Sequence, residues 1–386
     1  MQSVKKRNKN ALFLSAILFL SSCFFVEGAT RIHHLFKYGY LSQTKKVIYE
    51  GVKNTKQIMD DAEKVRSEAY PYLIYRVKPN QSFGTITVNA LGFRGREIAK
   101  IKPDATVRVI MLGGSALWGT GASSDNSTIT YELEKLLNNS AEGKKYEVIN
   151  AGDGGYVTMQ ELITLCDRAI DLNPDIVITF DGFNDIYSGF TNGIAGYPQN
   201  FSHFKQKLEA NNIFYHLLTA VTQPLTHSMF IRKLNNKFRI FSMRNAKVNS
   251  DGIPFVYAEP FEVARVFGRN LSYIHAITKE RNIISLFTIQ PMLGVGVKKL
   301  TPEEQGSLKA LNENIKGYIV YLRRTAGFLV KELKLLEQSS KAHVLDLTGV
   351  FDSNDGTVYL DYCHISDVGN KAVAEKIYGA LKTNLP

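Results

Sequence analysis

Residues Val107–Ser123 read VRVIMLGGSALWGTGAS, an apolar run that ends at two glycines and is followed at once by a serine. Five of the six residues Val107–Leu112 are apolar, and three of those are β-branched, which is typical of a strand buried on both faces. The two glycines permit a tight turn and leave room around Ser115. The stretch predicts a buried strand that presents Ser115 just beyond its carboxyl end, either as a chemical group or as a simple cap.

From Val107 to the C-terminus, short apolar runs alternate with amphipathic ones. This alternation is typical of βαβ units, so we expect an α/β fold in three α/β/α layers with a largely parallel central sheet. Functional groups in such sheets gather beyond the carboxyl ends of the strands. The expected strands are Val107–Leu112, Tyr146–Asn150, Ile176–Phe180, Ile283–Ile289 and His343–Leu347. The expected helices are Thr128–Leu137, Met159–Leu172, Phe261–Arg281, Glu303–Glu337 and Asp367–Leu381.

The first residues have the pattern of an export signal. A basic segment, Met1–Asn10, precedes the apolar segment Ala11–Leu20 and then Leu20-Ser21-Ser22-Cys23. The ending is similar to a bacterial lipoprotein cleavage box, in which the cysteine is lipidated. An ordinary cleaved signal and a short uncleaved anchor remain alternatives. Each alternative predicts an extracytoplasmic protein, with a membrane surface as a partner where Cys23 carries lipid or the anchor is kept.

We expect three parts of the chain: a signal segment over 1–23, an N-terminal arm over 24–105, and the α/β domain over 106–386 with an insertion at about 200–255. In the arm, Gln43–Glu68 mixes apolar residues with many charged ones and predicts an amphipathic helix. The segment Ser82–Gly95 then has a β-like pattern and predicts a lead-in hairpin or an extended arm.

The net charge of +11 is distributed unevenly along the chain. Residues 202–249 hold eight lysines and arginines against one acid, Glu209, with aromatic and aliphatic residues between them. This segment predicts a basic helical insertion, either a solvated helix pair or a lid and surface for anionic polymers or lipid headgroups. We expect no nucleic acid as a partner, because the N-terminus indicates export.

Polar residues follow three of the expected strands in addition to Ser115. Asn150-Ala151-Gly152 leads into a glycine-rich loop, Asn184 lies in Asp181-Gly182-Phe183-Asn184-Asp185, and Asp361-Tyr362-Cys363-His364 precedes the last helix. A serine nucleophile needs a base, and the base needs an orienting group. Ser115, His364 and Asp361 are the candidates for these three roles. The N–H groups of Ser115 and Gly152 and the amide of Asn184 are the candidate donors to an oxyanion.

Other kinds of site fit the sequence less well. The loop after Gly152 has Val157 where the dinucleotide fingerprint needs a third glycine, and no P-loop motif is present. Neither H-E-x-x-H nor paired C-x-x-C occurs, so we expect no metal and no cofactor. Besides Cys23, the cysteines are Cys166 and Cys363, which we interpret as small buried residues. We interpret Asp153, Asp181 and Asp185 as loop-fixing groups, and expect Trp118 and Tyr156 to pack the loops or line an acyl pocket.

These four blocks resemble those of the SGNH hydrolases, also called the GDSL esterase/lipase superfamily, over roughly Val107–Leu381. The resemblance implies a flavodoxin-like fold and a site made by Ser115, Gly152, Asn184, Asp361 and His364. The segment Asn89–Arg94, N-x-x-G-F-R, is similar to a feature of bacterial extracytoplasmic members. One departure exists: the family's G-D-S is Gly113-Gly114-Ser115 here, and the missing aspartate is not a member of the triad.

The resemblance implies a serine ester hydrolase of the carboxylesterase or deacetylase type. Its expected substrate is an extracytoplasmic ester, borne by a small molecule, a lipid or an acylated glycan. One alternative keeps the same site but transfers the acyl group to a cell-surface polysaccharide. Another is a non-catalytic envelope or binding protein that has kept the fold.

Overall fold

The structure is a computed structural model that describes residues 55–141, 143–199, 201 and 257–382, together with Ser22 and Val26. The elements below all belong to one compact unit of the chain. Apart from Ser22, the expected signal segment 1–23 lies outside the described residues, as does the basic insertion 202–249. Within the described ranges, no helix combines the length and the apolar composition that a membrane crossing requires.

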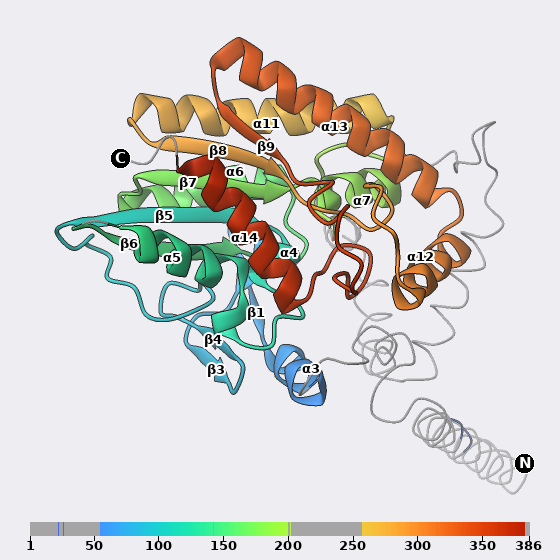
Figure 1. The fold of residues 1–386 in the computed structure, drawn as a ribbon, viewed down its shortest axis with the longest axis horizontal. Coiled ribbons are helices and arrows are strands. Elements are labelled where there is room, and N and C mark those ends of the chain that lie inside the picture. Colours follow the sequence, from blue (N-terminus) through green and yellow to red (C-terminus); the bar gives the residue numbers. More distant parts are fainter. Residues whose placement is uncertain are drawn as a thin grey trace, which may run out of the picture. The chain divides into compact units, whose positions relative to one another are not determined.

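In the described part of the chain, five parallel strands form the central sheet in the spatial order β6-β5-β7-β8-β9 (Figure 1). Every residue of β7 is buried, as is every residue of β5 after Thr106, which explains the nearly continuous apolar sequences of both strands. The predicted parallel α/β sheet is confirmed, with strand ends that differ by at most two residues. The strands are β5 (Thr106–Gly113), β6 (Lys145–Gly152), β7 (Ile176–Asp181), β8 (Ile284–Ile289) and β9 (His343–Asp346).

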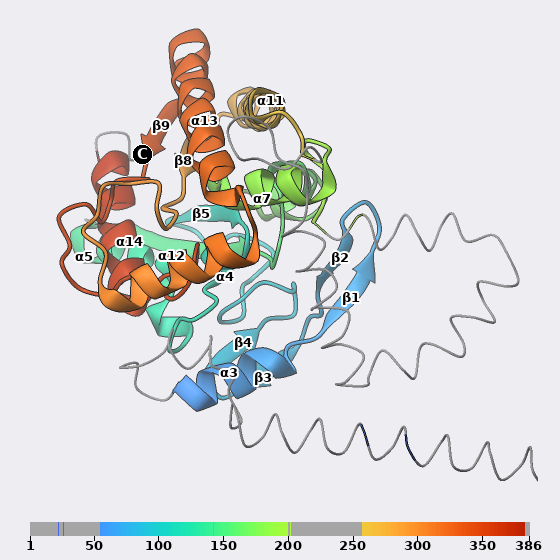
Figure 2. The ribbon, with the colours of Figure 1, turned by 90° about the vertical axis from the view of Figure 1, so that its right-hand side faces the viewer.

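Helices cover both faces of this sheet and complete the three layers (Figures 1 and 2). On one face, α5 and α14 bury residues such as Leu133 and Ile377 in a core that includes Val109 of β5. On the other face, α7, α11 and α13 share a core with Val177 of β7 and Phe287 of β8. The helices are α4 (Ser115–Trp118), α5 (Ile129–Ser140), α6 (Thr158–Thr164), α7 (Phe183–Asn192), α11 (Pro260–Glu280), α12 (Pro302–Asn314), α13 (Tyr318–Ser340) and α14 (Asp367–Leu381). Three short helical segments are η1 (Asp125–Ser127), η2 (Leu165–Ala169) and η3 (Ile170–Leu172).

The single helix predicted over Glu303–Glu337 is wrong, because the structure divides it into α12 and α13. The break falls at Gly317, which has a φ of +81°, a backbone conformation that ends a regular helix and favours glycine. A capping box formed by Thr301 and Glu304 begins α12. The break was not predicted, because the amphipathic pattern continues on both sides of Gly317.

The N-terminal helix prediction is also corrected. Of the expected Gln43–Glu68 helix, the described part is α3 (Thr55–Lys64), and Glu68 lies instead in strand β1 (Ser67–Tyr70). β1 pairs with β2 (Ile74–Val77) as an antiparallel hairpin. A second hairpin of β3 (Gln81–Phe83) and β4 (Ile86–Val88) confirms the β-like pattern of the lead-in segment.

Candidate active site

Ser115 opens α4 at the point where β5 ends. Its peptide N–H belongs to the first turn, where a helix supplies no acceptor. The two glycines before it are needed for space: a Cβ on Gly113 would lie 2.8 Å from Leu117 Cβ, and one on Gly114 would lie 2.2 Å from Asn184 Nδ2. The serine is therefore presented by a turn into which larger residues do not fit.

Asp361 and His364 lie in the loop that precedes α14. Asp361 Oδ1 accepts hydrogen bonds from the peptide N–H groups of Cys363 and His364, both at 2.8 Å, so the carboxylate folds the loop around itself. A bridge between Tyr359 and Ile365 closes the same loop. The three-residue spacing brings the two side chains together through this loop and not through a helical turn.

Ser115, His364 and Asp361 form a continuous chain of hydrogen bonds. His364 Nε2 lies 2.8 Å from Ser115 Oγ, and His364 Nδ1 lies 2.6 Å from Asp361 Oδ2. Burial lowers the pKa of His364, but the adjacent Asp361 carboxylate outweighs it and holds that pKa well above its usual value. Burial raises the pKa of Asp361, but His364 and the two hydrogen-bonded loop amides lower it by more, so the pKa of Asp361 lies below its usual value. The order of groups is that of a nucleophile, a base and an orienting acid.

A buried carboxylate anchors the segment just before this loop. Glu304 Oε1 accepts hydrogen bonds from the peptide N–H groups of Val358 at 2.9 Å and Tyr359 at 3.1 Å. Its Oε2 accepts one from Lys298 Nζ at 2.7 Å, and neither side chain of this ion pair is more than 3% exposed. The first turn of α12 thereby determines where the loop that carries the histidine begins. The T-x-x-E pattern of Thr301–Glu304 indicates a helix start, but nothing in the sequence connects Glu304 with the loop that carries His364.

Arg94 of the N-terminal lead-in holds the other end of α4. Its Nη1 donates to the carbonyl oxygens of Trp118 at 3.1 Å and Gly119 at 2.8 Å, which lie at the C-terminus of that helix. Its Nε pairs with Asp125 Oδ1 at 2.8 Å, and the side chain is 1% exposed. A cation satisfies helix C-terminal carbonyls well, so the N-x-x-G-F-R segment steadies the helix that presents the serine.

Asn184 projects from the first turn of α7 towards the serine turn. Its Nδ2 donates to the carbonyl oxygen of Tyr156 at 2.8 Å, which fixes the orientation of the amide. The same nitrogen lies against Gly114, next to Ser115. Because an amide nitrogen carries two hydrogens, the second one is left for a bound oxygen.

Gly152 does not fit the role expected for it. Its N–H already donates to Asn150 Oδ1 at 3.1 Å, and a Cβ at this position would lie 2.7 Å from the peptide nitrogen of Trp118. The glycine is therefore required for packing of β6 against α4. Three residues further on, Gly155 has a φ of +79°, and its N–H donates no hydrogen bond to any described residue. A sequence signal for Gly155 was present, because the Gly154-Gly155 pair lies in the glycine-rich loop that follows Gly152.

Two of the three aspartates interpreted as loop-fixing groups, Asp153 and Asp185, do fix loops, whereas no loop hydrogen bond is found for the Asp181 side chain among the described residues. Asp153 accepts hydrogen bonds from the peptide N–H groups of Val77 and Gly154, and Asp185 accepts one from Thr158 Oγ1 at 2.7 Å. Burial raises the pKa of Asp153 to about 6 and that of Asp185 to about 6.

Asp181 belongs to a buried pair that the sequence did not reveal. It lies next to Glu161 of α6, and both carboxyls are almost completely buried. Burial raises the pKa of Asp181 to about 7. Burial and the two neighbouring acids, Asp181 and Asp185, raise the pKa of Glu161 well above its usual value. Burial and the closeness of the two carboxyls therefore both favour the protonated form in this pair.

The expected packing role of Trp118 and Tyr156 is confirmed. Trp118 shares a small core with Val77 and Ile86, and Tyr156 is 1% exposed. The Tyr156 hydroxyl donates to the backbone carbonyl of Tyr75 at 2.7 Å. Both rings therefore join the N-terminal hairpins to the loops around Ser115.

The interpretation of both cysteines as buried is half wrong. Cys363 is 3% exposed, and burial raises the pKa of its thiol to about 11. Cys166 is exposed, on the outer side of η2, and neither of these two cysteines forms a disulfide.

Of the histidines outside the triad, His275 and His343 are described, and His275 has a structural contact. His275 Nδ1 lies 3.1 Å from Ser285 Oγ, and burial lowers the pKa of its imidazole. His343 is exposed at the start of β9. His33, His34, His203, His216 and His227 lie outside the described residues.

Among the described residues, one group of side chains brings three potential metal ligands together: Asp361, Cys363 and His364, whose ligand atoms all lie within 4.8 Å of one another. Two of these atoms already bond each other at 2.6 Å. The Asp361 carboxylate also accepts two peptide N–H groups. The potential ligand atoms of Asp361 and His364 are therefore already engaged in hydrogen bonds.

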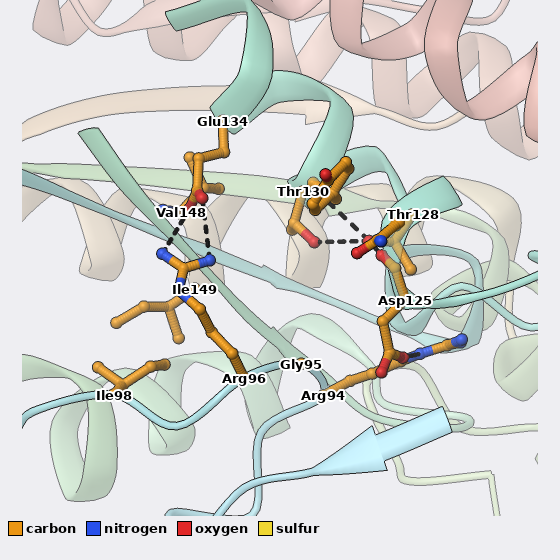
Figure 3. A pocket seen from close by; sticks show the side chains of 12 residues that line it. Arg94, Gly95, Arg96, Ile98, Asp125, Thr128, Thr130, Glu134, Val148 and Ile149 are labelled. Carbon is orange, nitrogen blue, oxygen red and sulfur yellow. Dashed lines mark hydrogen bonds and ion pairs between the residues drawn. The ribbon is translucent and has the colours of Figure 1, made fainter. Parts of the chain in front are cut away.

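A small cavity of about 90 Å³ lies between the lead-in segment and α5 (Figure 3). Figure 3 shows Arg96 directed at Glu134 while Arg94 approaches Asp125. The charged atoms of Arg96 and Glu134 lie 2.9 Å apart, and those of Arg94 and Asp125 lie 2.8 Å apart. None of the residues that line it belongs to the triad. The cavity marks where ion pairs attach the lead-in segment to α5 and η1.

No protein-family model matches the sequence, and a search of curated protein sequences gives no match. Solved structures do show a likeness. An acetylxylan esterase from Geobacillus stearothermophilus, solved as a catalytic mutant, has a TM-score of 0.42 at 12% identity, covering 73% of this chain and 96% of its own. A lipase/acylhydrolase from Enterococcus faecalis has a TM-score of 0.40 at 16% identity, with 72% and 97% covered. An acetyl xylan esterase, AlAXEase, has a TM-score of 0.39 at 14% identity, with 71% and 100% covered.

At these identities the likeness concerns the fold alone. What the site can do chemically therefore follows from this chain's own side chains. Numbered along the chain, the five strands of the central sheet lie in the order 2-1-3-4-5, which is that of a flavodoxin-like doubly wound α/β fold.

Proposed function

We propose that this chain is a serine ester hydrolase that works through an acyl-enzyme on Ser115. The observation that carries the proposal is the pair of distances joining Ser115 Oγ to His364 Nε2, 2.8 Å, and His364 Nδ1 to Asp361 Oδ2, 2.6 Å. A serine hydroxyl becomes nucleophilic at neutral pH when a base so oriented removes its proton.

In the acylation step, Ser115 Oγ forms a bond to the ester carbonyl carbon while its proton passes to His364 Nε2. Asp361 holds the Nδ1–H tautomer and stabilises the imidazolium that results. When the tetrahedral intermediate collapses, the imidazolium gives this proton to the leaving alkoxide and an alcohol departs. Water, deprotonated by the same His364, then attacks the acyl-serine. When this second intermediate collapses, the imidazolium returns the proton to Ser115 Oγ, the acid departs and the free serine is restored.

Three N–H donors are available for the oxyanion. They are the peptide N–H of Ser115, the second Nδ2 hydrogen of Asn184, and the peptide N–H of Gly155. The last replaces Gly152, whose N–H is engaged with Asn150. Donors held in place before the reaction stabilise the developing charge without reorganisation.

The proposed substrate is an ester outside the cytoplasm, because residues 1–23 have the pattern of an export signal. Cell fractionation of the expressed full chain checks this location. Recovery of the protein in the cytoplasm with an intact N-terminus would contradict it.

The test of the chemistry is Ser115→Ala, with Ser140→Ala as a matched control at an exposed position of α5. We expect Ser115→Ala to lower kcat for p-nitrophenyl acetate by roughly 10⁴-fold or more and to abolish labelling by a p-nitrophenyl phosphonate. Ser140→Ala should keep both. Mass spectrometry of the labelled chain should locate the phosphonate on Ser115, and a label elsewhere would refute the assignment.

A further inference from the structure

The loop Asp153–Tyr156, between β6 and α6, borders Ser115 along its inner side. The peptide N–H of Asp153 donates to the carbonyl oxygen of Gly113 at 3.0 Å. At the other end of the loop, the carbonyl oxygen of Tyr156 accepts the Asn184 amide at 2.8 Å. Gly113 and Asn184, which hold the two ends of the loop, both lie beside Ser115. The loop therefore borders the space that the carbonyl group of a bound ester would occupy.

The outer side of this loop is held by the β1–β2 hairpin, about eighty residues earlier in the sequence. The hydroxyl of Tyr75 donates to the carbonyl oxygen of Gly154 at 2.5 Å, and the peptide N–H of Val77 donates to Asp153 Oδ2 at 2.8 Å. In return, the Tyr156 hydroxyl donates to the carbonyl oxygen of Tyr75 at 2.7 Å. The Tyr75 and Tyr156 rings also meet edge to face, with centroids 5.7 Å apart. The hairpin therefore forms part of the frame of the site.

The carbonyl bonded by Tyr75 shares its peptide plane with the N–H of Gly155. A peptide unit is planar and trans, so its C=O and N–H point in opposite directions. A hydroxyl that holds the C=O on the outer side therefore directs the N–H towards the inner side, where Ser115 lies. A hydrogen bond to the carbonyl also polarises the unit and strengthens the N–H as a donor.

This peptide needs an external hydrogen bond to fix its orientation, because it joins two glycines, Gly154 and Gly155. Glycine has no Cβ and adopts both signs of φ, so a peptide between two glycines rotates more freely than any other. Gly155 has a φ of +79°, and a Cβ there would lie 3.0 Å from Tyr75 Oη and 2.8 Å from Gln199 Oε1. The sequence gives this peptide no local preference, and the tertiary contact supplies one.

We propose that Tyr75 is a positioning residue for catalysis: its hydroxyl selects the orientation of the Gly154–Gly155 peptide in which the Gly155 N–H faces the oxyanion. This proposal rests on the proposed function, because it assigns a task to one donor of the same site. It also gives the β1–β2 hairpin a part in the reaction that is separate from the stability of the fold.

The test compares Tyr75→Phe with Tyr70→Phe, two deletions of one hydroxyl on the same hairpin. The Tyr70 hydroxyl donates to Asp167 Oδ2 at 2.7 Å, away from the loop, so it is a matched control. For Tyr75→Phe we expect kcat to fall about tenfold with KM unchanged, since a misdirected donor weakens only the transition state. The rate of Ser115 phosphonylation should fall in parallel. Tyr70→Phe should keep both rates, and both variants should unfold at the wild-type temperature.

Hydrogen exchange supplies a readout that does not depend on catalysis. Exchange of the peptide N–H groups of residues 154–156 should speed up in Tyr75→Phe and stay unchanged in Tyr70→Phe. A Tyr75→Phe rate within twofold of wild type, or equal losses in both variants, would overturn the positioning role while leaving Ser115 as the nucleophile. If the phosphonate does not label the wild-type chain, the proposed function fails and the role of Tyr75 falls with it.

Discussion

His364 is subject to two opposed influences whose balance determines when it acts as a base. Burial favours its neutral form, and the Asp361 carboxylate 2.6 Å away favours the imidazolium. The carboxylate prevails, so the pKa of His364 lies well above its usual value. Only the neutral imidazole can accept the serine proton, and activity should therefore rise with pH through the pKa of His364.

Replacing Asp361 by Asn tests this balance. Without the carboxylate, burial alone acts on the imidazole, so the pKa of His364 should fall and the rising limb of kcat/KM should move to lower pH. The amide also stabilises the wrong tautomer, so we expect kcat to fall by roughly 10⁴-fold. The pH–rate profile and NMR titration of the His364 ring check both effects. A limb that stays in place would show that Asp361 does not set the protonation of His364.

Gly114→Ala tests the close approach at the serine turn. The new Cβ would lie 2.2 Å from Asn184 Nδ2, so either the amide or the serine has to move. We expect kcat to fall by about 10²-fold, the effect of losing one oxyanion donor, while the chain still folds. Gly327→Ala, in α13, is the control because a Cβ there meets nothing within 4 Å. Full activity in Gly114→Ala would show that Asn184 is not needed where it lies.

At the scale of elements, the site depends on loops that are anchored by buried charge. The D-x-x-H spacing predicted that Asp361 and His364 would meet, and the structure brings them together. The sequence did not predict the anchor, because Glu304 belongs to α12 and its partners Val358 and Tyr359 lie in a different segment. Local patterns report which residues share a helix face, but they do not report which buried group meets a distant loop.

Glu304→Gln tests that anchor. The variant leaves Lys298 buried at 3% exposure without its counter-charge, which costs on the order of 3 kcal/mol of stability. The histidine loop should loosen first, so we expect kcat to fall at temperatures well below the unfolding midpoint. Glu337→Gln, at an exposed position of α13, should change neither. Thermal unfolding and activity measured together check this, and equal behaviour of the two variants would contradict it.

For the molecule as a whole, buried acids determine how stability responds to pH. The pKa values of Glu161, Asp181 and Asp185 are raised in the folded chain, the latter two to about 7 and about 6 from an unfolded value of 3.8. The folded state thus holds protons that the unfolded state releases. The stability that these groups contribute is fully present below pH about 4 and is lost as pH rises through about 7.

Glu161→Gln should reduce this dependence, because the amide can still donate to Asp181 but has no proton to lose. We expect the difference in unfolding free energy between pH 5 and pH 8 to be smaller in Glu161→Gln than in wild type. Glu375→Gln, exposed on α14, should leave that difference unchanged. Urea unfolding at the two pH values measures it. If the difference in unfolding free energy between pH 5 and pH 8 is the same in Glu161→Gln as in wild type, Glu161 is not the group that holds the proton.

The sequence by itself determined the parallel sheet, because short apolar runs typical of buried strands alternate along the chain with amphipathic runs typical of helices. It also determined that Ser115, Asn184, Asp361 and His364 gather at one edge, because parallel strands end on the same side. The tertiary structure decided which glycine has a free N–H, where Glu303–Glu337 breaks, and that the β1–β2 hairpin supports the site. These outcomes depend on contacts between segments far apart in the chain, such as Tyr75 with Gly154, which no local pattern encodes.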